Sequence, residues 1–474
     1  MVASTVVGTA AAHSLGDNYG TVVDIVDAGA DSDGGTSITP ILRRTAADDT
    51  LLKFPPGRYY MDEQFRFTGF ENFGLLGNDA TLVPANYHEF DGPQYRLFRL
   101  GVGDSPGRSL RFEGFTVDQT APDTGIRVIN AEVEDGLVVQ DIVVRGRHDS
   151  GTWGPGLFNI TDPDGSGVVE RFTARGGAAW VDETPNAGNL WRGPSGIIAN
   201  RNHEGTLRFR NCALGAFPDN GLYASGGTGT VVVEGGRYQN SGTASIRLGG
   251  RRVVVDGATA RVGWNPENYV RQDPIRLDYA GWATLKNVTV DVPRPNGIGI
   301  AVRNGVDGVT IRNASISMAR TPTTGVGISP QVGPSYLEDV EVEMDASGNA
   351  IEIRGDSPGE VGLQNVRITG DASGSPLRHA IYCSRDHCQF RGVDIDQTGG
   401  EKRRGLELNG RDYLLYDCDF GTTHHPVVVN GDNVWVENCR FDSYAGYASL
   451  KLNDGAGSIR LKNSSFPDGV ADLR

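Results

Sequence analysis

Leu-Glu-Asp-Val-Glu-Val at residues 337–342 and Leu-Gln-Asn-Val-Arg-Ile at residues 363–368 are two copies of one short motif. Further copies begin at residues 112, 139, 209, 233, 285, 311, 390, 415 and 436. Apolar residues alternate with other residues in each copy, as in a strand with one buried face, and Asn, Asp or Gly interrupts the alternation. These three residue types tolerate the left-handed backbone of a sharp corner. Each copy therefore predicts a strand, a corner and a second strand.

A second series of short strands lies upstream of these copies. It consists of an apolar, a variable and an apolar residue, and its triplets at residues 222, 246, 275 and 300 start 24, 29 and 25 residues apart. That spacing is the length of one coil with three short strands. Stacked coils pair each strand with its equivalents above and below, and each coil packs only on its neighbours. The sequence predicts an all-β fold, a single right-handed parallel β-helix with three sheets.

Three segments are expected along the chain. Residues 1–20 form an N-terminal tail or signal remnant, residues 21–60 a cap, and residues 61–474 the β-helix. Within the cap, Thr39 is the expected N-cap and Pro40 the first residue of a short helix. Residues 3–12 resemble the end of a signal peptide, which indicates a secreted or cell-surface protein.

The charge balance limits the partners of the protein. Its net charge of −15, from 59 acidic and 44 basic residues, argues against general binding of nucleic acids. The sequence has no run of about eighteen apolar residues, so it predicts no membrane span. The basic residues are almost all Arg, which is typical of a halophilic organism or of GC-rich codon usage. The sequence leaves the oligomeric state open.

The five cysteines do not form the pattern of a disulfide framework. Cys212, Cys418 and Cys439 follow corner positions, where a small side chain must fit inside the coil, and are expected to be buried thiols. Cys383 and Cys388 flank a turn, and whether they pair is left open.

The N-terminal segment resembles the opening of pectate-lyase-like β-helix proteins. The resemblance rests on Val23-Asp24, the run Gly-Ala-Asp-Ser-Asp-Gly at residues 29–34, and Phe-Pro-Pro-Gly-Arg-Tyr at residues 54–59. That superfamily includes polysaccharide lyases, glycoside hydrolases, epimerases and phage tailspikes, and the whole chain resembles secreted β-helix proteins of halophilic archaea. The resemblance implies the fold and not a reaction.

The catalytic motifs of the better-known members are not found in the sequence. It lacks the Asp pair of polygalacturonases with its Gly-His-Gly and Arg-x-Lys companions, and the Asp-Pro-His-Glu of alginate epimerases. It also has no clear match to the acidic cluster of calcium-dependent pectate lyases. No cofactor and no metal site are therefore expected, although a calcium ion is left open.

The middle residue of each triplet is expected to point outward and to form one column on an external sheet. Neighbours in this column would lie about 4.8 Å apart. Consecutive arginines at that spacing repel unless an anion binds or acidic residues intervene, so the column predicts either a carboxylate or sulfate binder or ordinary ion pairing. The expected column consists of Arg66, Arg99, Arg127, Phe158, Ile198, Tyr223, Arg247, Arg276, Ala301, Gly327, Glu352, Tyr382 and Glu407.

Two long insertions add aromatic residues near the same coils. Trp153 and Trp191 lie in them and are candidate sugar platforms, although packing of the loops would explain them equally well. Polar segments that contain Asn202, His203 and Asp219 are expected nearby.

Two reactions fit these candidates. In a lyase, Tyr223 or His203 would be the base, with Arg247 and Arg276 supplying positive charge. In a hydrolase, Asp219 and Asp278 would be the carboxyl pair. The pair His424-His425 is expected in a solvated turn. The sequence thus predicts an extracellular protein that binds and cleaves an acidic polysaccharide, or alternatively a non-catalytic surface, matrix or tailspike-like β-helix.

Overall fold

The computed structural model describes residues 16, 18–92, 95–185, 190–319, 323–355, 359–374 and 379–474. It divides into two compact units. The N-terminal unit comprises residues 1–218 and 226–230, and the C-terminal unit comprises residues 219–225 and 231–474. Both are built as parallel β-helices, which confirms the predicted fold class.

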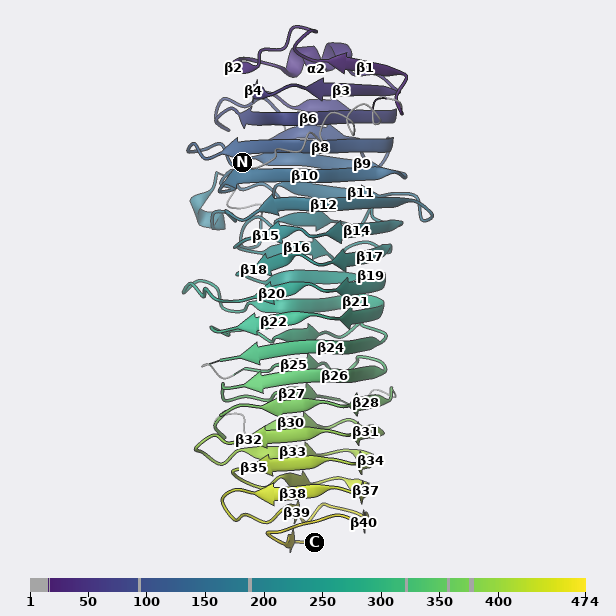
Figure 1. The fold of residues 1–474 in the computed structure, drawn as a ribbon, viewed down its shortest axis with the longest axis vertical. Coiled ribbons are helices and arrows are strands. Elements are labelled where there is room, and N and C mark those ends of the chain that lie inside the picture. The colour runs from purple at the N-terminus through teal and green to yellow at the C-terminus, as the bar shows by residue number, and fades with distance from the viewer. Residues whose placement is uncertain are drawn as a thin grey trace, which may run out of the picture. The chain divides into compact units, whose positions relative to one another are not determined.

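In the residues that the structure describes, the N-terminal unit contains helix α2 (Thr39–Thr45), the short 3-10 helix η1 (Val181–Glu183) and fifteen strands. Figure 1 shows β6, β8, β10 and β12 stacked one on the next. The strands are β1 (Thr21–Asp24), β2 (Asp33–Ser37), β3 (Thr50–Phe54), β4 (Gly57–Met61), β5 (Phe65–Phe67), β6 (Glu71–Pro84), β7 (Arg96–Leu100), β8 (Arg108–Gln119), β9 (Arg127–Val133), β10 (Leu137–Gly146), β11 (Gly156–Ile160), β12 (Ser166–Ala174), β13 (Ile197–Ala199), β14 (Thr206–Arg210) and β15 (Ala213–Leu214).

The C-terminal unit is also built from short parallel strands. It contains β16 (Asn220–Ala224), β17 (Thr230–Glu234, from residue 231 on), β18 (Arg237–Gln239), β19 (Ala244–Asp256), β20 (Thr259–Arg261), β21 (Asp273–Lys286), β22 (Thr289–Val292), β23 (Ile300–Val302), β24 (Val309–Met318), β25 (Val326–Ile328), β26 (Ser335–Met344), β27 (Ile351–Ile353), β28 (Val361–Gln364), β29 (Arg367–Thr369), β30 (His379–Cys383), β31 (Cys388–Arg391), β32 (Asp394–Gln397), β33 (Arg404–Leu408), β34 (Arg411–Tyr416), β35 (Asp419–Thr422), β36 (Val427–Val429), β37 (Asp432–Glu437), β38 (Arg440–Ser443), β39 (Leu450–Leu452), β40 (Ile459–Lys462) and β41 (Val470–Asp472).

The triplet strands form one parallel sheet in each unit, which we call the first sheet. In the N-terminal unit it runs β5, β7, β9, β11, β13. In the C-terminal unit it runs β16, β19, β21, β23, β25, β27, β30, β33, β36, β39, β41. Parallel strands from about residue 61 onward are thereby confirmed. The pairing starts earlier still, because β1 pairs with β3 and β3 pairs with β6.

The corners lie where the motif predicts them. The third motif residue has a positive φ in the left-handed region, for example 49° at Asn313 and 54° at Asp339. The same holds for Asn211, Asn287, Asn365, Asp417 and Asn438. Flanking apolar residues point into the coil, and Leu285, Ile311 and Leu337 are each 0% exposed. The three cysteines after corners, Cys212, Cys418 and Cys439, are buried free thiols, as predicted.

Two local predictions are wrong. The N-cap of α2 is Ile38, and Thr39 is already helical because its hydroxyl donates instead to the Glu63 carbonyl at 3.2 Å. His424 is buried rather than solvated, with its ring 4.3 Å from that of Tyr447. In the described part of the chain, no helix has the length and apolar character needed to span a membrane.

Candidate functional site

Four arginines gather on the first sheet of the N-terminal unit. Arg66 pairs in register with Arg99, and Arg96 pairs in register with Arg127. Strands β5, β7 and β9 thus bring two like-charged pairs onto adjacent coils, where in-register neighbours lie about 4.8 Å apart. We call Arg66, Arg96, Arg99 and Arg127 the arginine cluster.

The structure corrects the predicted column at two positions. Arg99 is followed by Asn130 and not by Arg127, and Asn130 is followed by Leu157 and not by Phe158. The amides of Val128 and Ile129 both donate to the carbonyl of Pro155, at 3.0 and 3.1 Å. The register of β7 with β9 is regular and pairs Phe98, Arg99 and Leu100 with Ile129, Asn130 and Ala131, so that Arg127 lies beside Arg96. Arg127 is almost fully buried there.

The arginine cluster carries excess positive charge. Among the residues that the structure describes, none of its four guanidinium groups forms an ion pair with a carboxylate. The carboxylates that act on it electrostatically are Glu132 and Asp104. Burial and the neighbouring arginines lower the pKa of Arg96 to about 10 and that of Arg127 to about 9. The charged forms are therefore held in an unfavourable environment, which a bound anion would relieve.

Several hydrogen-bond donors in the arginine cluster have no acceptor in the described protein. They are Nε of Arg96, Nε of Arg99 and Nδ2 of Asn130, all of them buried atoms. Oδ1 of Asn130 accepts from Arg96 at 3.4 Å and from Arg127 at 3.3 Å, so Asn130 holds the two guanidinium groups together. The unmatched groups are all donors, which suits a ligand that is rich in acceptors.

The aromatic ring of Trp153 lies beside the arginine cluster. Its carbonyl accepts from Nε of Arg127 at 2.9 Å, and its ring centroid lies 5.6 Å from the Arg127 guanidinium carbon. The Trp153 side chain stays 45% exposed. The preceding loop is held by buried His148, whose Nε2 donates to the Thr152 carbonyl at 3.0 Å. Trp153, predicted as a sugar platform, thus lies where it can contact a ligand of the arginines.

A network of amides connects the predicted residue Asn202 to the cluster through Glu132. Oε2 of Glu132 accepts from Asn202 at 2.7 Å and from Asn159 at 3.1 Å. Asn159 also donates to Oδ1 of Asn200 at 2.9 Å. Sequence reasoning missed Arg96 and Glu132, although Arg96 precedes a recognised triplet by only two residues.

The predicted Tyr223, Arg247 and Arg276 do lie in register on the first sheet of the C-terminal unit. Both arginines, however, already form an ion pair with one shared carboxylate. Asp278 accepts from Nε of Arg247 at 2.6 Å and from Nε of Arg276 at 2.9 Å, and the Arg247 guanidinium lies 4.9 Å from the Tyr223 ring centroid. This arrangement matches the ion-pairing interpretation of the column. Asp278, considered above as a hydrolytic carboxylate, bridges the two arginines.

The remaining predicted site residues are His203, Asp219 and Trp191. His203 is buried, with Nδ1 accepting from the Ile160 amide at 3.4 Å and Nε2 donating to the Thr230 carbonyl at 3.2 Å. Both ring nitrogens are thus engaged with the backbone. Asp219 is half-buried in the C-terminal unit, and Trp191 is 79% exposed in the N-terminal unit.

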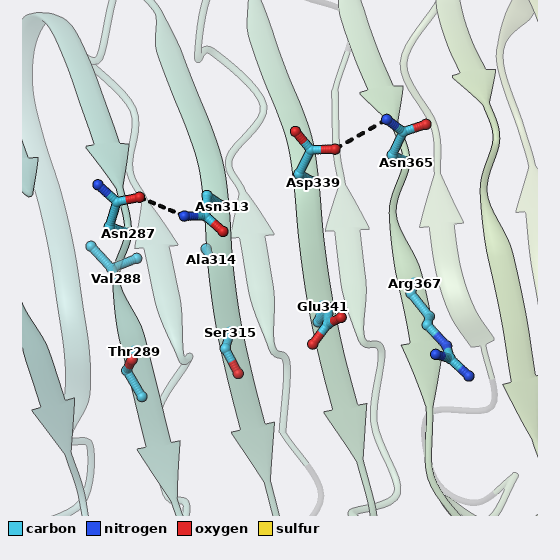
Figure 2. A pocket seen from close by; sticks show the side chains of 10 residues that line it. All are labelled: Asn287, Val288, Thr289, Asn313, Ala314, Ser315, Asp339, Glu341, Asn365 and Arg367. Atoms are coloured by element: carbon cyan, nitrogen blue, oxygen red, sulfur yellow. Dashed lines mark hydrogen bonds between the residues drawn. The ribbon is translucent and has the colours of Figure 1, made fainter. Parts of the chain in front are cut away.

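A polar groove of about 510 Å³ follows the corners of the C-terminal unit. Figure 2 shows Asn287, Asn313, Asp339 and Asn365 in one row, with Thr289, Ser315, Glu341 and Arg367 in a second row. Asn313 donates to Asn287 at 2.5 Å, and Asn365 donates to Asp339 at 3.0 Å. Most of these amides form hydrogen bonds with a neighbouring coil, so their arrangement is explained by stabilisation of the corners. In the described residues, no group of three His, Cys, Asp or Glu side chains could hold a metal ion.

Comparisons with known proteins give only distant likenesses. No family model matches the sequence, and no curated protein matches it. Pre-mature bacteriophage phi29 gene product 12 is similar in structure with 13% sequence identity and a TM-score of 0.48, over 94% of this chain and 72% of that chain. A GH87 alpha-1,3-glucanase from Streptomyces thermodiastaticus is similar with 14% identity and a TM-score of 0.30, over 95% of this chain and 69% of that chain. A family 28 exopolygalacturonase from Yersinia enterocolitica is similar with 12% identity and a TM-score of 0.24, over 96% of this chain and 79% of that chain. They include polysaccharide-acting enzymes and a phage protein, and they are too distant to assign an activity.

Proposed function

We propose that the protein binds an acidic polysaccharide at the cell exterior, and that the arginine cluster recognises the carboxylates or sulfates of that polysaccharide. The observation that carries the proposal is the pair of in-register arginine contacts, Arg66 with Arg99 and Arg96 with Arg127, without a carboxylate ion pair in the described structure. On a protein with a net charge of −15, such a local excess of positive charge favours a specific anionic ligand.

The surroundings of the arginine cluster favour a sugar that carries the anion. Trp153 offers an exposed ring face next to Arg127, and aromatic rings pack well against the apolar faces of pyranoses. Nδ2 of Asn130 has no acceptor in the described protein, and this donor suits a carboxylate or hydroxyl oxygen of the sugar. A glycan that runs along the sheet would meet guanidinium groups on successive coils.

Binding is tested by calorimetric titration of the full-length protein with polyuronate, sulfated and neutral oligosaccharides. The variant Arg66→Gln/Arg99→Gln removes one arginine pair, and we expect its affinity for the anionic glycan to fall about tenfold to hundredfold. Its melting temperature should not fall, because the substitution also removes repulsion between like charges. The matched control is Arg43→Gln. Arg43 is exposed in the same unit and forms an ion pair with Glu63.

Equal binding by the double variant and wild-type protein would refute the proposal. Cleavage is examined separately, by following the length of the glycan and the ultraviolet absorbance of unsaturated uronates. A lyase would produce that absorbance and a hydrolase would not. A binding protein that leaves the glycan intact would match the alternative of a non-catalytic surface β-helix.

A further inference from the structure

Two thiols face each other inside the C-terminal unit. Cys383 is the last residue of β30 and Cys388 is the first residue of β31. Both are 0% exposed, and their Sγ atoms are 3.5 Å apart. A disulfide needs an Sγ–Sγ distance of about 2.0 Å, so only a small movement of the side chains separates the pair from a bond.

The turn between the two cysteines is held firmly in place. Arg385 is fully buried and donates to the carbonyls of Gly333, Ser329 and Arg354 at 3.1, 3.1 and 3.2 Å. Oδ1 of Asp386 accepts from the Arg411 amide at 2.8 Å. The backbone therefore presents the thiols to each other before any bond is formed between them.

The environments of the two sulfur atoms differ. Burial opposes ionisation of Cys383, but its hydrogen bond with Cys388 and the nearby charge of Arg385 act the other way, so the pKa of Cys383 is lowered. The pKa of Cys388 is raised by its interaction with the Cys383 sulfur and by burial. One sulfur is thus the better nucleophile and the other the proton donor, which suits stepwise thiol–disulfide exchange.

We propose that Cys383 and Cys388 form a structural disulfide when the protein folds in the presence of a disulfide oxidant such as glutathione disulfide. The Cys383 thiolate attacks the oxidant, forms a mixed disulfide and releases one glutathione thiolate. Cys388 then loses its proton and attacks Sγ of Cys383, releasing the second glutathione. Two protein thiols are oxidised to one disulfide, and one glutathione disulfide is reduced to two thiols. The bond closes the turn that carries Arg385.

The test uses a convenient cleavage site between the two cysteines. Full-length protein is refolded with glutathione disulfide, denatured, alkylated without reductant and digested with trypsin, which cuts after Arg385. We expect peptides 379–385 and 386–391 to remain joined, with a mass lower by two hydrogen atoms than the sum of the free peptides. Reduction should separate them. Cys212, which lies in the N-terminal unit, should be alkylated in the same sample.

Cys383→Ser is the matched variant, and in it Cys388 should be fully alkylated. Recovery of both wild-type peptides separately alkylated would overturn the proposal. So would a link from either cysteine to Cys418 or Cys439. Because no glycan is involved, these outcomes are independent of the proposed polysaccharide binding.

Discussion

At the scale of single residues, buried arginines serve two different purposes in this protein. The guanidinium group of Arg385 donates hydrogen bonds to three backbone carbonyls of neighbouring turns. Arg127 instead contacts one carbonyl and Asn130, and two other arginines, Arg96 and Arg99, lie close to it. Carbonyl acceptors in the fold account for the burial of Arg385, whereas Arg127 forms no ion pair with a carboxylate in the part of the chain that the structure describes.

Arg385→Met should strongly destabilise the C-terminal unit. The substitution removes three hydrogen bonds that a fully buried side chain makes to backbone carbonyls, and we expect the free energy of unfolding to fall by about 3 kcal/mol. Urea unfolding followed by circular dichroism measures the effect. Arg391→Met is the control, since Arg391 is exposed and its guanidinium donates to the Gln389 side chain, and its cost should stay within about 0.5 kcal/mol.

His148 should make the N-terminal unit sensitive to acid. Burial lowers its pKa from 6.5 to about 3, so between these values the unfolded chain binds a proton that the folded protein does not. Stability is therefore fully present above pH 6.5 and falls as the pH decreases towards 3. At pH 4.5 the loss from this residue should be roughly 2–3 kcal/mol relative to pH 7.

The measurement compares urea unfolding at pH 7 and pH 4.5 for wild-type protein and His148→Gln. The variant should lose less stability on acidification, because glutamine does not titrate. Identical losses in the two proteins would show that His148 does not couple folding to pH.

At the scale of elements, the coil corner is the feature that recurs along the chain. Residues such as Asn313 adopt φ near 49° and donate through their side chains to the preceding coil. Asparagine combines two properties that a corner needs: it tolerates the left-handed backbone, and its amide both donates and accepts. Glycine supplies only the first property, at Gly235 and Gly392.

Substitutions at Asn313 should separate these two contributions. Asn313→Gly keeps the left-handed backbone and loses only the side-chain hydrogen bond, so we expect a cost of about 1 kcal/mol. Asn313→Ala adds backbone strain and should cost roughly 1–2 kcal/mol more. Chemical denaturation of both variants provides the test, and an alanine variant as stable as the glycine variant would contradict the role of the corner conformation.

At the scale of the whole molecule, each unit is a series of coils in which a strand contacts its equivalents in the adjacent coils. Leu285 in β21 lies in register with Val255 and Ile311, and all three are 0% exposed. Stability in such a stack depends on interactions between nearest neighbours, so that damage is expected to stay local.

Leu285→Ala should reveal this locality. The cavity should cost about 2–5 kcal/mol. Hydrogen exchange followed by mass spectrometry should become faster in β19, β21 and β24, while amides of the N-terminal unit keep their protection. A uniform increase of exchange along the chain would instead indicate that both units unfold as one.

The sequence by itself determined the strands, the corners, the buried cysteines after corners and the outward column of the C-terminal unit. These features repeat along the chain, and they follow from local rules: which residues alternate, and which tolerate a left-handed backbone. Tyr223, Arg247 and Arg276 were placed in register from triplet spacing alone.

Only the tertiary structure decided where positive charge remains unpaired. The register of β7 with β9 places Arg127 beside Arg96 and not beside Arg99. Asp278, the residue after a neighbouring triplet, bonds to both Arg247 and Arg276. Likewise, the 3.5 Å contact between Cys383 and Cys388 depends on the path of the turn between them. Register and charge pairing are set by distances between coils, and a repeating sequence pattern specifies which face a side chain occupies but not which partner it meets there.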